Sequence, residues 1–225
     1  MTTDNARADA TTITYLGHSS LLVDMKLTSG KNARILLDPG NLTPPIDNVG
    51  HVDAVLVTHS HPDHVDPAQI QRLQASGVLT VYGPADVGEQ LQGLDVATTA
   101  VEPGTFDISG VKIDVAVHPH EPLYPGVPLP ENVAYTIDGR IFAPGDSLAL
   151  PGMPVDVLLA PLAGPWMKLS EGIDFVRAVS PRTAIPVHDA GLAPTHRRLH
   201  CAMFTANTPA GTQLRPLNPG ESWSN

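Results

Sequence analysis

The sequence predicts an α/β fold in which mixed β-sheet is flanked by helices. Three observations predict it: β-rich segments open the chain, short apolar runs then alternate with stretches carrying helix-start signals, and strand-like segments recur almost to the end. At 225 residues and 23.8 kDa the chain has the length of one large domain. We therefore expect a single domain over residues 1–225, with residues 1–10 as a flexible N-terminal segment.

The beginning of the chain predicts an antiparallel meander of three strands. Residues 11–16 and 20–27 are β-rich and lie on either side of Gly17-His18-Ser19, and residues 33–37 end at Asp38. The apolar run 54–57, Ala-Val-Leu-Val, is typical of a strand buried on both faces.

A helix is predicted directly after this buried strand and its loop. Asp66 supplies an N-cap, Pro67 occupies the first helical position, and the helix is expected to end near Ser76. Further strands and one short helix then follow in a βαβα order. The expected strands are 78–82, 96–101, 105–108 and 111–117, and the expected helix is 85–91.

The second half of the chain continues this alternation. Residues 132–137 and 140–142 predict a hairpin through Asp138-Gly139, a dipeptide suited to a type I′ turn. Apolar residues recur at helical spacing from Leu169 to Val179. The remaining expected elements are strands 155–160 and 183–187 and a helix at 195–204.

Composition excludes several classes of protein. A formal net charge of −10 disfavours binding to a phosphate backbone, so no nucleic-acid partner is expected. Cys201 is the only cysteine, which excludes an intramolecular disulfide and fits a reducing compartment. No apolar run approaches a membrane span, and the first ten residues lack a signal sequence. We expect a cytoplasmic protein with a small-molecule substrate, without a membrane partner; a homo-oligomer stays open.

Four potential metal-binding side chains lie close together after the buried strand: His59, His61, Asp63 and His64. The carboxyl ends of strands in open α/β sheets are where ligands bind. Imidazoles with a carboxylate suit zinc, and also Fe²⁺, Mn²⁺ or Ni²⁺. The alternative, a His-rich surface turn that binds nothing, poorly explains this density.

The pattern His59-x-His61-x-Asp63-His64 after a hydrophobic strand resembles the HxHxDH signature of the metallo-β-lactamase superfamily. The resemblance implies a four-layer αββα sandwich with a two-metal site at one edge of its two sheets. It also implies that His59 and His61 bind the first metal ion and that Asp63 and His64 bind the second.

The resemblance assigns the remaining metal ligands to three downstream segments. Spacing alone leaves His118 and His120 as competitors for the first ion, and the position before Asn132-Val133-Ala134-Tyr135 in similar sequences favours His120. Gly-Asp-Ser after a strand resembles the motif whose aspartate, here Asp146, bridges both ions. His188, at the end of a predicted strand, resembles the terminal ligand of the second ion.

Four further side chains are candidates for positions behind or beside the metal ions. Gly17-His18-Ser19-Ser20 resembles the opening of the branch that includes ascorbate-6-phosphate lactonase, and His18 either faces the site or is a hydrogen-bonded turn histidine. Asp38 matches a carboxylate that accepts a ligand histidine's second N–H. Trp166 is a pocket-wall or packing residue, and His118 remains a pocket candidate.

The implied activity is that of a binuclear metal-dependent hydrolase. Two divalent ions, with Zn²⁺ favoured, would provide a metal-bridging hydroxide that cleaves an ester or lactone, free or phosphorylated. Asp63 would accept a proton in this reaction. The alternatives are a phosphodiesterase and a catalytically silent metal-binding scaffold.

Overall fold

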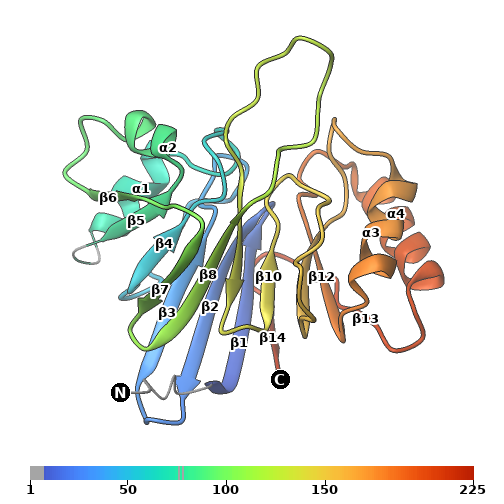
Figure 1. Ribbon diagram of the computed structural model, residues 1–225, viewed down its shortest axis with the longest axis horizontal. Helices are drawn as coiled ribbons and strands as arrows, with labels where there is room; N and C mark the ends of the chain where they lie inside the picture. Colours follow the sequence, from blue (N-terminus) through green and yellow to red (C-terminus); the bar gives the residue numbers. More distant parts are fainter. Residues whose placement is uncertain (1–7, 76, 78) are drawn as a thin grey trace.

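Two mixed β-sheets lie face to face, and helices cover their outer surfaces (Figure 1). The computed structural model describes residues 8–75, 77 and 79–225. Within these residues each sheet has seven strands. Sheet A has the order β14 (Ser222–Ser224), β1 (Ala8–Gly17), β2 (Ser20–Leu27), β3 (Asn32–Leu37), β4 (Ala54–Leu56), β5 (Thr80–Gly83), β6 (Ala97–Ala100). Sheet B has the order β13 (Gln213–Leu214), β12 (Thr183–Val187), β11 (Val157–Pro161), β10 (Ile141–Ala143), β9 (Val133–Ile137), β8 (Val111–Val117), β7 (Gly104–Ile108).

Three layers of apolar packing hold the sheets and helices together. Alternating residues of β1, β3 and β8 point inward, so Ile13, Ile35 and Ile113 are completely buried between the sheets. Helices α1 (Pro67–Gln74) and α2 (Ala85–Gln90) cover sheet A, and α3 (Leu169–Val179) and α4 (Pro194–Asn207) cover sheet B. The four-layer αββα sandwich expected from the sequence is therefore confirmed.

Strand direction brings the functional loops to one edge of the sandwich. Strands β3 to β6 are parallel, as are β10 to β13. In each sheet two successive antiparallel pairings make a further strand parallel to these, β1 to β3 in sheet A and β8 to β10 in sheet B. The loops that follow β1, β3, β4, β8, β10, β11 and β12 therefore meet at the same edge, which we call the site edge. The loop between β8 and β9 extends beyond the rest of the molecule there (Figure 1).

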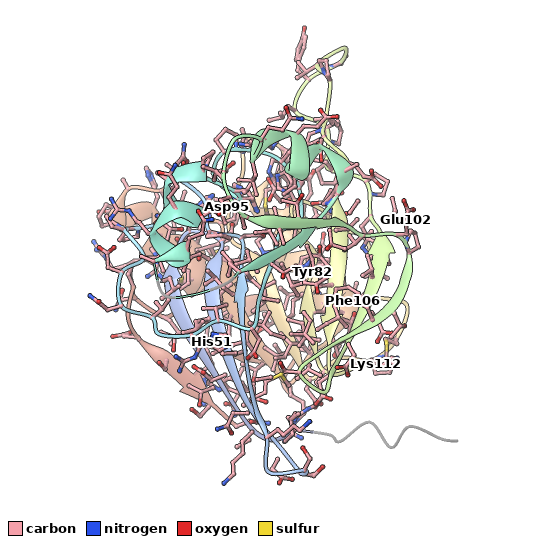
Figure 2. All side chains as sticks on the ribbon, turned by 90° about the vertical axis from the view of Figure 1, so that its left-hand side faces the viewer. His51, Tyr82, Asp95, Glu102, Phe106 and Lys112 are labelled. Carbon is pink, nitrogen blue, oxygen red and sulfur yellow. The ribbon has the colours of Figure 1, made fainter. Side chains whose placement is uncertain are left out.

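The two sheets also contact each other through aromatic side chains. Tyr82 of β5 stacks on Phe106 of β7 with ring centroids 4.9 Å apart, and both lie on the face shown in Figure 2. The hydroxyl of Tyr135 on β9 donates to the carbonyl of Val57, at 3.0 Å. These contacts fix sheet B relative to the loop that follows β4.

The structure corrects some of the expected boundaries. Residues 8–10 belong to β1 and pair with β2, so they are not a flexible segment; residues 1–7 lie outside the described residues. Ser76 and Val78, the expected end of α1 and start of β5, also lie outside them. Strands β13 and β14 were not predicted, because two or three residues are too few to show alternation. No helix among the described residues is long and apolar enough to cross a membrane.

Candidate metal centre

The His-rich loop between β4 and α1 is held rigidly on the segment after β3. The Asp66 side chain caps α1 by accepting from Ala68, and the Asp66 N–H donates to the Pro39 carbonyl at 3.0 Å. Gly40 packs directly beneath the loop: a Cβ added there would lie 1.8 Å from the Asp63 carbonyl oxygen. Only glycine fits at this contact, so the close approach of Gly40 restricts the position of the His-rich loop.

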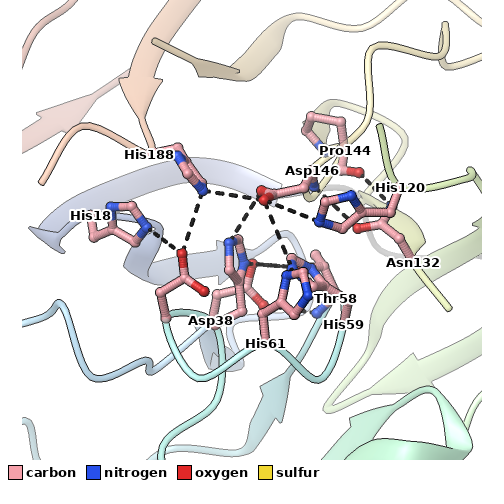
Figure 3. Close-up of polar contacts among 12 residues, drawn as sticks. His18, Asp38, Thr58, His59, His61, His120, Asn132, Pro144, Asp146 and His188 are labelled. Atoms are coloured by element: carbon pink, nitrogen blue, oxygen red, sulfur yellow. Dashed lines mark hydrogen bonds and ion pairs between the residues drawn. The ribbon is translucent and has the colours of Figure 1, made fainter. Parts of the chain in front are cut away.

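The loop and the ends of the sheet B strands bring together two clusters of donor side chains (Figure 3). Within each cluster the potential ligand atoms all lie within 4.8 Å of one another. The first cluster consists of His59, His61, His120 and Asp146, and the second of His18, Asp63, His64 and His188. Each cluster combines residues from both sheets.

Asp146 lies between the two clusters and contacts both. Its Oδ2 is 3.5 Å from His120 Nε2 and 3.2 Å from His188 Nε2, and its Oδ1 is 3.2 Å from His64 Nε2. The indole N–H of Trp166 donates to Asp146 Oδ2 at 2.8 Å. One carboxylate thus has the position of a bridge, and Trp166 holds it.

Four histidines of the site share one orientation, in which Nδ1 faces an acceptor and Nε2 faces inward: His59, His64, His120 and His188. His120 Nδ1 donates to the Glu121 carbonyl and His188 Nδ1 to the Ala163 carbonyl, both at 2.6 Å. His64 Nδ1 donates to Asp38 Oδ2 at 2.9 Å. His59 Nδ1 lies 3.1 Å from Thr58 Oγ1, which itself donates to Asp38. Such contacts fix the tautomer that binds a metal through Nε2.

The inward-facing atoms are buried and lack hydrogen-bond partners among the described residues. They are His64 Nε2, His120 Nε2, His188 Nε2 and Asp146 Oδ1. Buried polar atoms normally have a hydrogen-bond partner, so four unpaired atoms that point toward one another indicate a ligand-binding site. Imidazoles and carboxylates in this number fit two divalent cations.

The pKa shifts reflect the same concentration of charge. Burial lowers the pKa of His59, and the neighbouring His64 lowers it further. Burial also opposes protonation of His188, but the adjacent carboxylates of Asp146 and Asp63 outweigh it and raise the pKa to about 9. The carboxylates of Asp146 and Asp38 likewise raise the pKa of His64 despite its burial. Without a cation, protons therefore occupy positions that metal ions would take.

Three side chains at the site sit on left-handed backbone. His18, Asp38 and His188 have φ values of 52°, 41° and 56°. Residues other than glycine rarely adopt this conformation, which costs roughly 1–3 kcal/mol and clusters at functional sites. All three follow directly on strand ends or a tight turn, where the surrounding hydrogen bonds hold them.

The structure places the other sequence candidates differently. His118 packs edge-on against Phe142, which belongs to the apolar core between sheet B and helices α3 and α4. His118 is in neither donor cluster. Thr58 and Asn132 were not singled out, although Asn132 accepts from the Asp146 N–H at 3.1 Å and donates to the Pro144 carbonyl at 3.0 Å. Asn132 opens the strand motif used to locate His120, which was the available signal.

Comparison with known proteins identifies the family. The family model described as "Beta-lactamase superfamily domain" matches residues 12–188. The protein Rv0786c of Mycobacterium tuberculosis is 33% identical over 214 residues, covering 91% of this chain and 96% of the relative. The chain belongs to the metallo-β-lactamase superfamily.

Two more distant matches are similar to most of this chain. A protein of Nanoarchaeum equitans named as a UPF0173 metal-dependent hydrolase is 28% identical over 192 residues, covering 78% of this chain and 82% of the relative. Igni18, described as a metallo hydrolase of Ignicoccus hospitalis, superposes with a TM-score of 0.70 at 18% identity, covering 96% of this chain and 98% of that one. At this identity the superposition shows the fold. The lactonase-like branch expected from Gly17-His18-Ser19 stays a prediction.

Proposed function

We propose that this metallo-β-lactamase superfamily member hydrolyses a carboxylic ester or lactone of a small, mainly apolar molecule. Family membership and two donor clusters support the general activity, that of a binuclear metal-dependent hydrolase. The substrate class is our proposal, and one observation carries it: the loops at the site edge contain almost no cationic side chains.

The charge of these loops disfavours a phosphate-bearing substrate. The loops after β1, β3, β4, β8, β10, β11 and β12 include one Lys or Arg among their described residues, Lys168. Its ammonium pairs with Glu171 at 3.2 Å. Nearby Arg197, at the start of α4, is bound to Asp189 at 2.5 Å. Phosphate recognition usually uses Arg or Lys, so a phosphodiester or phosphorylated lactone would find little positive charge from side chains here.

The same loops expose large apolar side chains. Tyr124 is 73% exposed and Val127 is 44% exposed, both in the loop that begins after His120. Leu42 and Leu150, from the loops after β3 and β10, are also about half exposed, at 48% and 53%. Pockets for small molecules are lined mainly by such residues. They favour a substrate whose recognised part is apolar.

The site residues have defined parts in this reaction. When bound, two divalent ions, of which we propose Zn²⁺, supply Lewis acidity that lowers the pKa of water and polarises the scissile carbonyl. The six histidine and aspartate side chains His59, His61, His64, His120, His188 and Asp146 would hold these ions together with Asp63. Burial raises the pKa of Asp63, but the hydrogen bond from His18 and the adjacent imidazole of His188 outweigh it and hold the pKa below its usual range, so the carboxylate is ionised. Its part as a transient proton acceptor is our proposal.

The test compares substrate classes with zinc-loaded protein. We expect p-nitrophenyl butyrate or a γ-lactone to be turned over with a higher kcat/KM than bis(p-nitrophenyl) phosphate. His61→Ala is the control, and it should lose metal and activity while keeping its circular dichroism spectrum. A preference for the phosphodiester would establish the phosphodiesterase alternative. Two bound ions without turnover of any class would establish the silent scaffold.

A further inference from the structure

His18 lies in the second cluster, so distance alone would permit it to be a metal ligand. Its Nε2 is 3.1 Å from Asp63 Oδ2, and its ring centroid is 4.3 Å from that of His188. The side chain is 2% exposed. Its role therefore depends on which ring nitrogen carries the proton.

The hydrogen bond at Nδ1 determines which nitrogen of His18 carries the proton. His18 Nδ1 accepts a hydrogen bond from the backbone N–H of Ala190, at 3.3 Å. An accepting Nδ1 carries no proton, so the neutral ring carries its proton on Nε2. His64, His120 and His188 have the opposite arrangement, because their Nδ1 atoms face a carboxylate or carbonyl acceptor.

We infer that His18 is a positioning residue: its Nε2–H donates to Asp63 Oδ2 and fixes that carboxylate, and His18 does not bind a metal ion. The inference rests on the proposed two-metal site, in which Asp63 is a ligand. It is supported by the pattern of orphaned atoms. The Nε2 atoms of His64, His120 and His188 lack hydrogen-bond partners among the described residues, whereas Nε2 of His18 has Asp63.

His18 also connects Asp63 to the strand end that carries His188. The backbone carbonyl of His18 accepts from the His188 N–H at 2.8 Å. The next residue, Asp189, is held by the Tyr15 hydroxyl and by Arg197. The β1–β2 turn therefore ties Asp63, in the loop after β4 of sheet A, to residues 188–190, which follow β12 of sheet B. These contacts fix the distance between Asp63 and His188, the two donors of the second ion that His18 connects. Asp63 Oδ2 and His188 Nε2 are 3.5 Å apart.

The first experiment separates a ligand from a positioning residue by counting metal. His18→Gln keeps an N–H donor near Asp63, His18→Ala removes it, and His188→Ala removes a proposed ligand. At saturating Zn²⁺ we expect about two ions per chain in both His18 variants and about one in His188→Ala. Zinc affinity of the second ion should fall roughly 10- to 100-fold in His18→Ala and recover in His18→Gln. Loss of one ion from both folded His18 variants, or equal weakening in both, would overturn the inference.

The second experiment needs no folded alanine variant. Long-range ¹H–¹⁵N correlation spectra of the labelled wild-type protein report which imidazole nitrogen is protonated, and comparison with His18→Gln assigns the His18 signals. We expect His18 in the Nε2–H form both without metal and with Zn²⁺. An Nδ1–H form, or a zinc-bound Nε2, would contradict it. If the wild type binds no zinc, the proposed function fails, while the metal-free spectrum still tests the tautomer.

Discussion

Asp38 holds the back of the His-rich loop through three hydrogen bonds. Its carboxylate accepts from the Thr58 N–H at 2.8 Å, the Thr58 hydroxyl at 2.9 Å and His64 Nδ1 at 2.9 Å. The contact with His64 is the one that the sequence resemblance implies for Asp38, and its effect on metal binding stays a prediction. The left-handed backbone at Asp38 aims the side chain toward the loop.

Replacing this carboxylate should weaken metal binding without removing a ligand. In Asp38→Asn the amide keeps one acceptor oxygen, so its NH2 group faces either the Thr58 N–H or the pair formed by the Thr58 hydroxyl and His64 Nδ1. We therefore expect zinc affinity to fall roughly 10- to 100-fold. A titration against a competing chelator measures it. Asp174→Asn, at an exposed position on α3, is the matched control and should bind zinc like the wild type. Unchanged affinity in Asp38→Asn would refute the role of Asp38.

Protons bound by the metal-free site predict the pH dependence of metal uptake. The pKa of His188 is about 9 and that of His64 is also raised, so both imidazoles are protonated near pH 7.5. Because zinc requires neutral imidazole, binding should release about two protons there, and fewer as pH rises through 9. Calorimetric titrations in buffers with different ionisation enthalpies measure the release. Binding without proton release near pH 7.5 would contradict these shifts.

At the residue scale, the metal-binding side chains could be predicted from the sequence, but their hydrogen-bond partners could not. His59, His61, Asp63 and His64 could be selected because they lie within six residues of one another. The tautomer of His18 could not be predicted, since it depends on the N–H of Ala190, which lies 172 positions along the chain. Thr58 could not be selected for the same reason, because its contribution to the site is a hydrogen bond to Asp38, which is distant in sequence.

At the scale of elements, the long patterned segments were predictable and the short ones were not. Strand β8 and helix α3 have the bounds that their alternation and helical spacing indicate. The hairpin turn also follows the sequence, because Asp138 and Gly139 both have positive φ, at 54° and 62°. Val117 shares a face of β8 with the buried Val111, Ile113 and Val115, but it is 46% exposed because β8 leaves the interior near its end. Strand β14 depends on pairing with β1, a partner distant in sequence.

The close contact between Gly40 and the His-rich loop predicts that a larger residue at position 40 would displace the loop. In Gly40→Ala the new Cβ would overlap the Asp63 carbonyl, so the loop must shift, at a cost of roughly 1–3 kcal/mol or more. Thermal unfolding of metal-free protein should show a lower Tm, and zinc binding should weaken. Gly211→Ala, where no atom of the described residues lies within 4 Å of the added Cβ, should change neither. A Gly40→Ala protein with wild-type Tm and zinc affinity would show that the loop is not confined as described.

At the scale of the whole molecule, the site joins two halves of the sandwich. Sheet A supplies the loop with His59 and Asp63, and sheet B supplies His120, Asp146 and His188. Metal ions bound by both sets would link the sheets only in the folded state. The excess of acidic residues, with a net charge of −10, makes bound cations more favourable still.

Metal removal should therefore lower the stability of the entire domain. Zinc at one hundred times its dissociation constant contributes about 2.7 kcal/mol per site, which for a chain of this size corresponds to a rise in Tm of roughly 5–10 °C. Differential scanning calorimetry with zinc and with a chelator measures the difference. His61→Ala should show a smaller rise, because it loses metal. Equal Tm values for zinc-loaded and chelator-treated wild type would contradict a cross-linking site.

Elemental analysis of freshly purified, untagged protein tests the two-metal centre most directly. The donor clusters predict about two divalent ions per chain, and about one after His188→Ala. If the protein retains no metal, and neither zinc, manganese nor iron binds when added, the converging imidazoles and carboxylates are not a metal centre and the proposed hydrolase is wrong.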